Sequence, residues 1–313
     1  MKLADKFKPQ KSWVMWSNGK IVKAPHQISS MSYPLHYGAP VIWEGVRSYK
    51  TADGSTQIFS LNEHIKRLFD SAKSLGVKVP FDFATLVEAT RSVVEANGGG
   101  DLYIRPVVYL DKDAKSISPD DTGTVRAEVY VFPITPHKGV KPGIRTAIST
   151  FTRGYPQFQM QIKNSSNYSF MHHCKLETEM FGVDDMLLTD NQGYITEATV
   201  ANIFIVKNGV VYTPPNNGSI LPGITRANIA RLLTRDTRLS TPTTILEKNL
   251  TKTDVYTADE IFICGTYVEV IPVVEVDKRV IGNGKPGDVT TRVQWLYSQL
   301  VRGYVHNSGG NDK

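Results

Sequence analysis

The stretch Gln161-Ile162-Lys163-Asn164-Ser165-Ser166-Asn167-Tyr168 places an amine in a polar segment directly before a helical pattern. Most lysines in such positions are simply solvated. Two later segments set this one apart. Glu197 stands before the apolar run Asn202-Ile203-Phe204, and Leu221-Pro222-Gly223-Ile224-Thr225-Arg226 leads into a helix. Lys163 is therefore the most informative residue of the chain.

Length and composition indicate an ordinary globular protein with room for two cores. A chain of 313 residues exceeds the size at which single cores stop growing, at about 250–300 residues. Hydrophobic residues make up 41 % and charged residues 21 %, as in typical globular domains. The formal net charge of +6 favours anionic ligands. Because lysines and arginines are scattered rather than clustered, no nucleic-acid partner is expected.

The termini and cysteines predict a cytoplasmic protein. Cys174 and Cys264 lie far apart without CxxC spacing, which favours two reduced thiols. No stretch approaches the roughly 18–20 apolar residues of a membrane span. The segment Met1 to Gln10 is polar and unlike a signal peptide, and His306 to Lys313 is expected to be a frayed tail.

The first part of the chain mixes strands and helices. Ser60 and Glu63 stand in capping-box spacing at the start of one helix, and Gly76 follows its end. The predicted elements are a hairpin over 13–24 with its turn at Asn18-Gly19, helices over 60–75 and 83–96, and strands over 102–110 and 124–132.

A break follows, because Pro133 to Gly143 holds three prolines and two glycines. We therefore predict a small N-terminal α/β domain over 1–133, an interdomain linker over 134–143 and a large C-terminal domain over 144–313. In the latter we expect strands over 144–150, 260–264 and 268–276, short strands between 185 and 212, and helices over 167–181, 225–235 and 288–301. Hairpin-like strands without regular crossover helices favour an α+β fold.

Three segments together carry the chemistry of a pyridoxal-phosphate site. Lys163 has Asn and Ser neighbours and no adjacent acid that would hold it as ammonium, which suits formation of an imine. A carboxylate such as Glu197 can keep a pyridine nitrogen protonated. The helix start after Gly223 offers unpaired N–H groups and the hydroxyl of Thr225 to a phosphate, although Thr225 as an ordinary N-cap is the alternative. Gly265-Thr266, after a buried strand, could form a second side of the phosphate site.

These segments resemble the class IV pyridoxal-phosphate aminotransferases of fold type IV, and among them the branched-chain amino-acid aminotransferases. The similarity runs from about Trp13 to Leu300. The matching segments are Lys163-x-x-x-Asn167-Tyr168, Glu197 with Asn202-Ile203-Phe204, Leu221 to Arg226, Gly265-Thr266, His36-Tyr37-Gly38, Glu44 to Tyr49, Glu63 to Leu68 and Leu102 to Pro106.

The resemblance implies a two-domain α+β fold and a pyridoxal 5'-phosphate cofactor bound by the large domain. Lys163 would form the internal aldimine and move protons at the substrate Cα. The cofactor set is Arg67, Lys163, Tyr168, Glu197, Leu221, Gly223, Ile224, Thr225 and Thr266. The substrate set is Tyr37, Trp43, Gly45, Arg47, Tyr103, Arg105, Thr266 and Tyr267.

The reaction implied is ping-pong transfer of the amino group of leucine, isoleucine or valine to 2-oxoglutarate. The resemblance also implies a homodimer or higher homo-oligomer, in which the segment from Tyr37 to Gly45 reaches the partner's site. A D-amino-acid or (R)-amine transaminase, a lyase such as aminodeoxychorismate lyase and a non-catalytic binding module are the alternatives. Tyr103-x-Arg105-Pro106 favours the branched-chain interpretation.

Three departures from the family pattern concern the substrate pocket. The run Ala39-Pro40-Val41-Ile42-Trp43 is one residue longer than expected and has Trp43 where Phe is usual. Ser165-Ser166 replaces the common glycines, and Ile134 to His137 lacks aromatic residues. His172-His173-Cys174 looks like a metal cluster, but adjacent helical positions point in different directions, so no metal is expected.

Overall fold

The computed structural model describes residues 13–25, 28–38, 40–113, 123–153, 160–236 and 245–304. The segments Met1 to Gln10 and His306 to Lys313, and Ala39 of the longer run, lie outside these ranges. The chain divides into two compact units. The first comprises 1–135, 162–168 and 301–304, and the second 136–161, 169–300 and 305–313. The domain boundaries at 133 and 144 remain a proposal.

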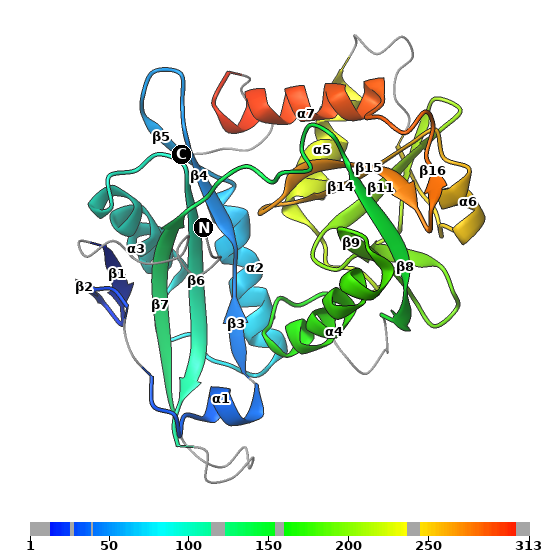
Figure 1. The fold of residues 1–313 in the computed structure, drawn as a ribbon. Helices are drawn as coiled ribbons and strands as arrows, with labels where there is room; N and C mark the ends of the chain where they lie inside the picture. Colours follow the sequence, from blue (N-terminus) through cyan, green and yellow to red (C-terminus); the bar gives the residue numbers. More distant parts are fainter. Residues whose placement is uncertain are drawn as a thin grey trace. The chain divides into compact units, whose positions relative to one another are not determined.

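A seven-stranded sheet forms the first unit (Figure 1). Its strands are β1 Val14–Ser17, β2 Lys20–Lys23, β3 Val41–Trp43, β4 Val46–Lys50, β5 Thr56–Phe59, β6 Leu102–Asp111 and β7 Thr124–Pro133. The order is β2-β1-β7-β6-β4-β5, and β3 also pairs with β6. The predicted hairpin with its turn at Asn18-Gly19 is confirmed, because β1 and β2 flank these two residues.

Two helices, α2 Leu61–Ser74 and α3 Phe83–Ala96, lie along one face of this sheet (Figure 1). Alternation along β6 buries Ile104 and Val108 in the core beneath them. Tyr103 and Arg105 therefore stand on the opposite face. A short helix, α1 Tyr33–Tyr37, precedes β3.

The predicted capping box at the start of α2 is wrong. Ser60 is the N-cap residue, but its backbone is left-handed (φ 51°) and its side chain makes no capping hydrogen bond. Residues that cap a helix through their side chain typically have an extended backbone, which Ser60 does not have.

The segment around Lys163 pairs with β3 as an added strand. Ser165 N donates to Val41 O at 2.8 Å, and Trp43 N donates to Lys163 O at 3.4 Å. Ile42 and Asn164 form a bridge between these two hydrogen bonds. Lys163 is consequently the cross-strand neighbour of Trp43 and belongs to the first unit, although it follows the predicted linker in sequence.

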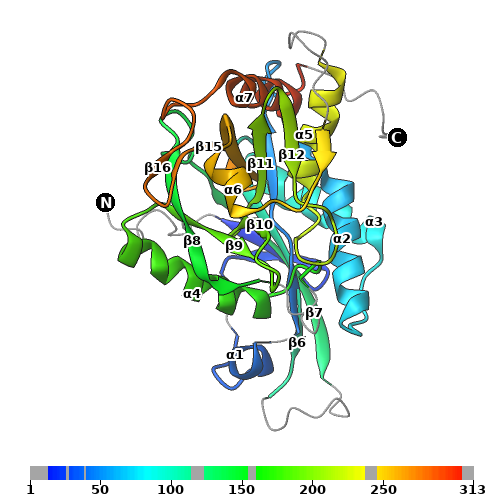
Figure 2. The same ribbon diagram turned by 90° about the vertical axis from the view of Figure 1, so that its right-hand side faces the viewer.

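The second unit is a nine-stranded mixed sheet, seen from the side in Figure 2. Its strands are β8 Ile144–Thr152, β9 Asp185–Thr189, β10 Ile195–Ala198, β11 Asn202–Lys207, β12 Val210–Thr213, β13 Ile245–Glu247, β14 Glu260–Gly265, β15 Glu269–Val276 and β16 Arg279–Val280. The order is β10-β9-β8-β15-β14-β11-β12-β13. An additional β10–β11 pairing closes a ring around an apolar core.

Four helices accompany this sheet: α4 Ser166–Phe181, α5 Ile224–Arg235, α6 Lys252–Tyr256 and α7 Asp288–Val301. The predicted helices over 167–181, 225–235 and 288–301 are thereby confirmed to within one residue. A real capping box occurs at α6, where Thr251 and Asp254 bond each other's backbone N–H groups. No helix within the described ranges is long and apolar enough to span a membrane.

Candidate active site

Lys163 lies against aromatic side chains of the first unit. Its Nζ donates to the hydroxyl of Tyr168 at 2.5 Å and stands 4.2 Å from the ring centroid of Trp43. The rings of Trp43 and Tyr168 pack together with centroids 4.7 Å apart. The three side chains that the sequence assigned to substrate and cofactor roles thus come together in one place.

The amine of Lys163 has a lowered pKa and therefore loses its proton more readily than an ordinary lysine. Burial lowers its pKa to about 8, although the carboxylate of Glu44 favours the ammonium form. The cationic side chains of Arg67 and Arg105 act in the same direction as burial. The expectation that no acid lies near Lys163 is therefore incomplete, because Glu44 approaches it from a distant part of the sequence.

Arg105 is enclosed by aromatic rings on the same face of the first sheet. Its guanidinium carbon lies 4.2 Å from the ring centroid of Trp43, 5.4 Å from that of Tyr103 and 5.6 Å from that of Phe132. Burial alone would lower the pKa of Arg105, but its interactions with the hydroxyls of Tyr103 and Tyr130 raise it above the usual value. The result is a cation presented between apolar walls.

Gly45 makes room for Tyr103. A Cβ at Gly45 would stand 1.8 Å from the hydroxyl oxygen of Tyr103 and 2.6 Å from its Cζ. Tyr103 is only 4 % exposed and packs on Phe132 with ring centroids 5.0 Å apart. Only glycine fits at position 45 while Tyr103 keeps this position.

Glu44 forms a buried ionic cluster with two residues of α2. Its carboxylate accepts from Arg67 Nε at 2.6 Å, from Arg67 Nη2 at 2.8 Å and from His64 Nδ1 at 2.7 Å. Burial would raise the pKa of Glu44, but the charge of Arg67 and these hydrogen bonds lower it to about 2. Burial lowers the pKa of His64, so the ring is neutral and Nδ1 carries the donated proton.

Glu197 is a buried carboxylate of the second unit, 3 % exposed, where β10 meets β11. It forms an ion pair with Arg153, whose Nη1 lies 2.5 Å from its Oε1. Its Oε2 accepts from Asn202 Nδ2 at 3.0 Å and from Leu221 N at 3.2 Å. One ion pair and two hydrogen bonds thus hold Glu197 in one orientation, and it is not the solvated strand end that isolated edge glutamates usually are.

The start of α5 follows Gly223, which is its N-cap residue and offers no side-chain cap. A Cβ there would stand 1.9 Å from Asn202 Oδ1, so glycine allows this close approach. Thr225 is inside the helix and 4 % exposed, which contradicts its alternative interpretation as an N-cap. The start of α5 thus has no side-chain cap, and the N–H groups of such a helix start favour an anion.

The remaining predicted site residues are distributed over both units. Arg47 is buried, with its guanidinium 4.8 Å from the ring centroid of Tyr49. Tyr37 ends α1, is 38 % exposed and packs on Tyr33 rather than on Lys163. Thr266 and Tyr267 lie in the turn between β14 and β15, and Tyr267 is 44 % exposed.

Several site residues were missed from the sequence. Alternation along β7 places Tyr130 and Phe132 beside Arg105 and Tyr103, and this signal was readable from their spacing. Arg153 had no sequence signal, because a single arginine after a strand is usually solvated. The role of Glu44 was also invisible, since its partners lie twenty and twenty-three positions away.

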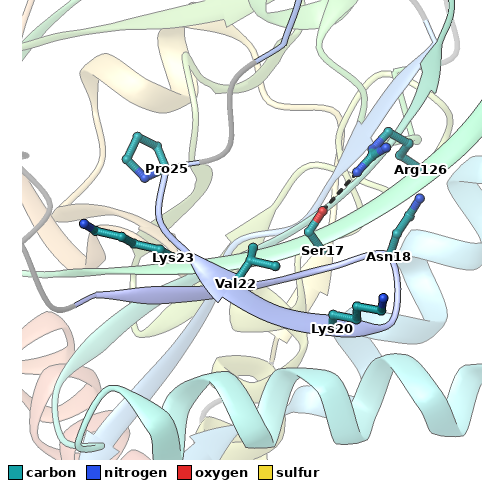
Figure 3. Close-up of a pocket in the computed structure, with 7 residues that line it drawn as sticks. All are labelled: Ser17, Asn18, Lys20, Val22, Lys23, Pro25 and Arg126. Carbon is teal, nitrogen blue, oxygen red and sulfur yellow. Dashed lines mark hydrogen bonds between the residues drawn. The ribbon is translucent and has the colours of Figure 1, made fainter.

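A hollow of about 570 Å³ lies by the β1–β2 hairpin of the first unit (Figure 3). Arg126 in its wall donates to Ser17 Oγ at 3.2 Å, and Asn18 accepts from Ala127 N at 2.9 Å. None of its lining residues is among the predicted site residues. Across the described ranges, no three or more His, Cys, Asp or Glu side chains gather as a metal site, and His172-His173-Cys174 is no exception.

Comparisons with known proteins agree with this geometry. The family model "Amino-transferase class IV" matches residues 42–276, so the chain belongs to the class IV aminotransferase family. A branched-chain-amino-acid aminotransferase of Pseudomonas aeruginosa is 35 % identical, over 93 % of each chain.

Solved structures of the same kind are also similar. The branched-chain amino acid aminotransferase of Escherichia coli has a TM-score of 0.89 and 31 % identity, covering 96 % of this chain and 98 % of that one. The branched-chain amino acid aminotransferase of Thermobaculum terrenum, in its PLP-form, has a TM-score of 0.86 and 27 % identity, covering 95 % and 96 %. The predicted fold-type IV α+β architecture is thereby confirmed.

Proposed function

We propose that this chain is a pyridoxal-phosphate-dependent aminotransferase that moves the amino group of branched-chain L-amino acids to 2-oxoglutarate. The main support is the state of Lys163 in this member of the class IV aminotransferase family. Its amine is partly buried, has a pKa of about 8 and is hydrogen-bonded to Tyr168. An amine with this pKa is neutral far more often at physiological pH than an ordinary lysine.

The proposed roles in the first unit follow from what each side chain offers. Lys163 would hold the cofactor through its amine and would carry the proton that leaves or returns to the substrate Cα. Tyr168 would hold the ring oxygen, and Arg67 would contribute to phosphate binding. Arg105 receives a substrate carboxylate, and the rings around it accept an aliphatic side chain. A charged group between apolar walls allows one pocket to accept both the aliphatic side chain of leucine and the carboxylate of 2-oxoglutarate.

The second unit also offers groups that suit pyridoxal phosphate. Glu197 is held by an ion pair and two hydrogen bonds and would provide a buried carboxylate for the ring nitrogen. Ile224 and Thr225 at the start of α5, which has no side-chain cap, would bind the phosphate with Thr266, and Leu221 would pack on the ring. When bound, pyridoxal phosphate supplies the electron sink that makes the substrate Cα acidic.

A panel of amino donors tests this proposal. The purified holoprotein is incubated with 2-oxoglutarate and L-leucine, L-isoleucine, L-valine, D-alanine or an (R)-amine, and glutamate formation is measured. We expect turnover with the three branched-chain L-amino acids. Turnover confined to D-alanine or (R)-amines, or pyruvate release from aminodeoxychorismate without an acceptor, would instead assign the alternative reactions.

We further propose a homodimer, with the region around α1 facing the second copy. Large apolar side chains gather there in an exposed state: Ile28 at 50 %, Met31 at 59 % and Leu35 at 64 %. A sequence-local set of this kind is typical of an interface. Light scattering during size-exclusion chromatography should give twice the 34.8 kDa chain mass for the wild type and a smaller mass for Met31→Glu/Leu35→Glu. A monomeric wild type would refute this part. The cytoplasmic location remains a prediction.

A further inference from the structure

Glu44 and His64 form a buried cluster with Arg67 and have no assigned role so far. Glu44 and His64 are 0 % and 1 % exposed, and the Arg67 side chain is 13 % exposed. Buried ionic groups are costly to desolvate, and replacement by apolar residues is often neutral or stabilising. A cluster of charge-assisted contacts beside the candidate nucleophile therefore invites a functional reason.

The contacts determine the orientation of the arginine. Glu44 takes Nε and Nη2 of Arg67 on its two carboxylate oxygens, at 2.6 and 2.8 Å. Such a two-point contact fixes the plane of the guanidinium, which a single contact leaves free to rotate. Glu44 is itself anchored, because its N donates to Pro106 O at 2.9 Å and His64 donates to its Oε2 at 2.7 Å.

One face of α2 connects this cluster to Lys163. His64, Arg67 and Ser71 are spaced three and four residues apart, so they stand on the same side of the helix. Ser71, only 1 % exposed, accepts from Lys163 N at 3.1 Å through its Oγ. The same helical face thus holds the arginine and the backbone of the candidate nucleophile in a fixed relation.

The charges also favour positioning over simple neutralisation. Burial raises the pKa of Glu44, but the contact with Arg67 lowers it, and the net pKa is about 2. The carboxylate is therefore ionised across the working pH range. Neutral His64 adds a hydrogen bond but no charge. Arg67 is consequently held by one permanent anion.

We propose that Glu44, supported by His64, is a positioning residue that fixes the guanidinium of Arg67 for a phosphate group. This rests on the proposed function, in which Arg67 contributes to binding the cofactor phosphate. Glu44 acts through Arg67 and does not itself contact the cofactor.

The test compares two ligands that differ only in the phosphate. Apoprotein of the wild type, Glu44→Gln and Glu44→Asp is titrated with pyridoxal 5'-phosphate and with pyridoxal. The quantity compared is the ratio of the affinity for pyridoxal 5'-phosphate to the affinity for pyridoxal. Glu44→Gln should lower this ratio about tenfold or more, since it removes charge-assisted bonds to Arg67. Glu44→Asp keeps the charge and should lower this ratio less than Glu44→Gln does. Glu260→Gln is the control, because Glu260 binds Val289 and Thr290 at the start of α7.

The possible outcomes separate the two proposals. An unchanged ratio in Glu44→Gln, or equal weakening of both ligands, would overturn the positioning role and leave a structural ion pair. If Glu44→Gln does not fold, an unchanged ratio in Glu44→Asp has the same consequence, and a lowered one supports positioning. A wild type that binds neither ligand would refute the proposed function itself, and Glu260→Gln should keep the wild-type ratio.

Discussion

Gly45→Ala provides a quantitative test of the first unit's site. The added Cβ would stand 1.8 Å from the Tyr103 hydroxyl, whereas real Cβ atoms essentially never come closer than 3.0 Å. The ring must therefore retreat by roughly 1 Å in a core position that is packed on Phe132. Overpacking of this kind costs about 1–3 kcal/mol of the free energy of unfolding. Because the guanidinium of Arg105 lies 5.4 Å from the same ring, the displacement should also disturb substrate binding.

Two measurements follow from this argument. Urea unfolding should give a free energy lower by about 1–3 kcal/mol for Gly45→Ala. Steady-state kinetics should give a raised KM for 2-oxoglutarate, whose carboxylate Arg105 is proposed to receive. The double variant Gly45→Ala/Tyr103→Phe removes the closest atom and should recover part of the loss, compared with Tyr103→Phe alone. Unchanged stability and KM in Gly45→Ala, or no recovery in the double variant, would refute the packing argument.

Two further predictions concern charge. Arg153→Met leaves Glu197 buried without its cation, so urea unfolding should give a free energy of unfolding lower by about 3–5 kcal/mol, and titration of the apoprotein should show weaker cofactor binding. The control is Arg292→Met, at the more exposed pair with Asp236, which should leave cofactor binding unchanged. Equal effects of the two variants would contradict a special role for Arg153. The second prediction concerns the rate at which the apoprotein reacts with pyridoxal, which should rise with pH and reach half its maximum near pH 8. The reason is that burial lowers the pKa of Lys163 to about 8 and only the neutral amine is a nucleophile. A midpoint near the ordinary pKa of 10.5 would show that Lys163 is not desolvated.

Local signals predicted most helices and several strands. Phe83–Ala96 and Asp288–Val301 match their predicted bounds because apolar periodicity and flanking glycines act over single turns. The strands Val41–Trp43, Val46–Lys50 and Thr56–Phe59 were missed, since short strands depend on their pairing partners in the sheet. Ser60 and Glu63 had the right spacing for a cap, but the backbone at Ser60 is left-handed.

The site was only partly predictable for the same reason. Motif residues such as Lys163, Glu197 and Thr225 were recognised from their order along the chain. Long-range partners were not, because the ion pair of Arg153 with Glu197 joins residues forty-four positions apart and Glu44 meets α2 only after folding. Pairing of Ser165 with Val41 likewise assigns the Lys163 segment to the first unit, against its position in the sequence.

The attachment site of the cofactor tests the central claim most directly. Holoprotein incubated with pyridoxal 5'-phosphate is reduced with borohydride, digested and examined by mass spectrometry. The account predicts a phosphopyridoxyl group on the peptide that contains Lys163, and loss of covalent attachment in Lys163→Ala. Attachment at another lysine, or a covalently held cofactor in Lys163→Ala, would contradict it.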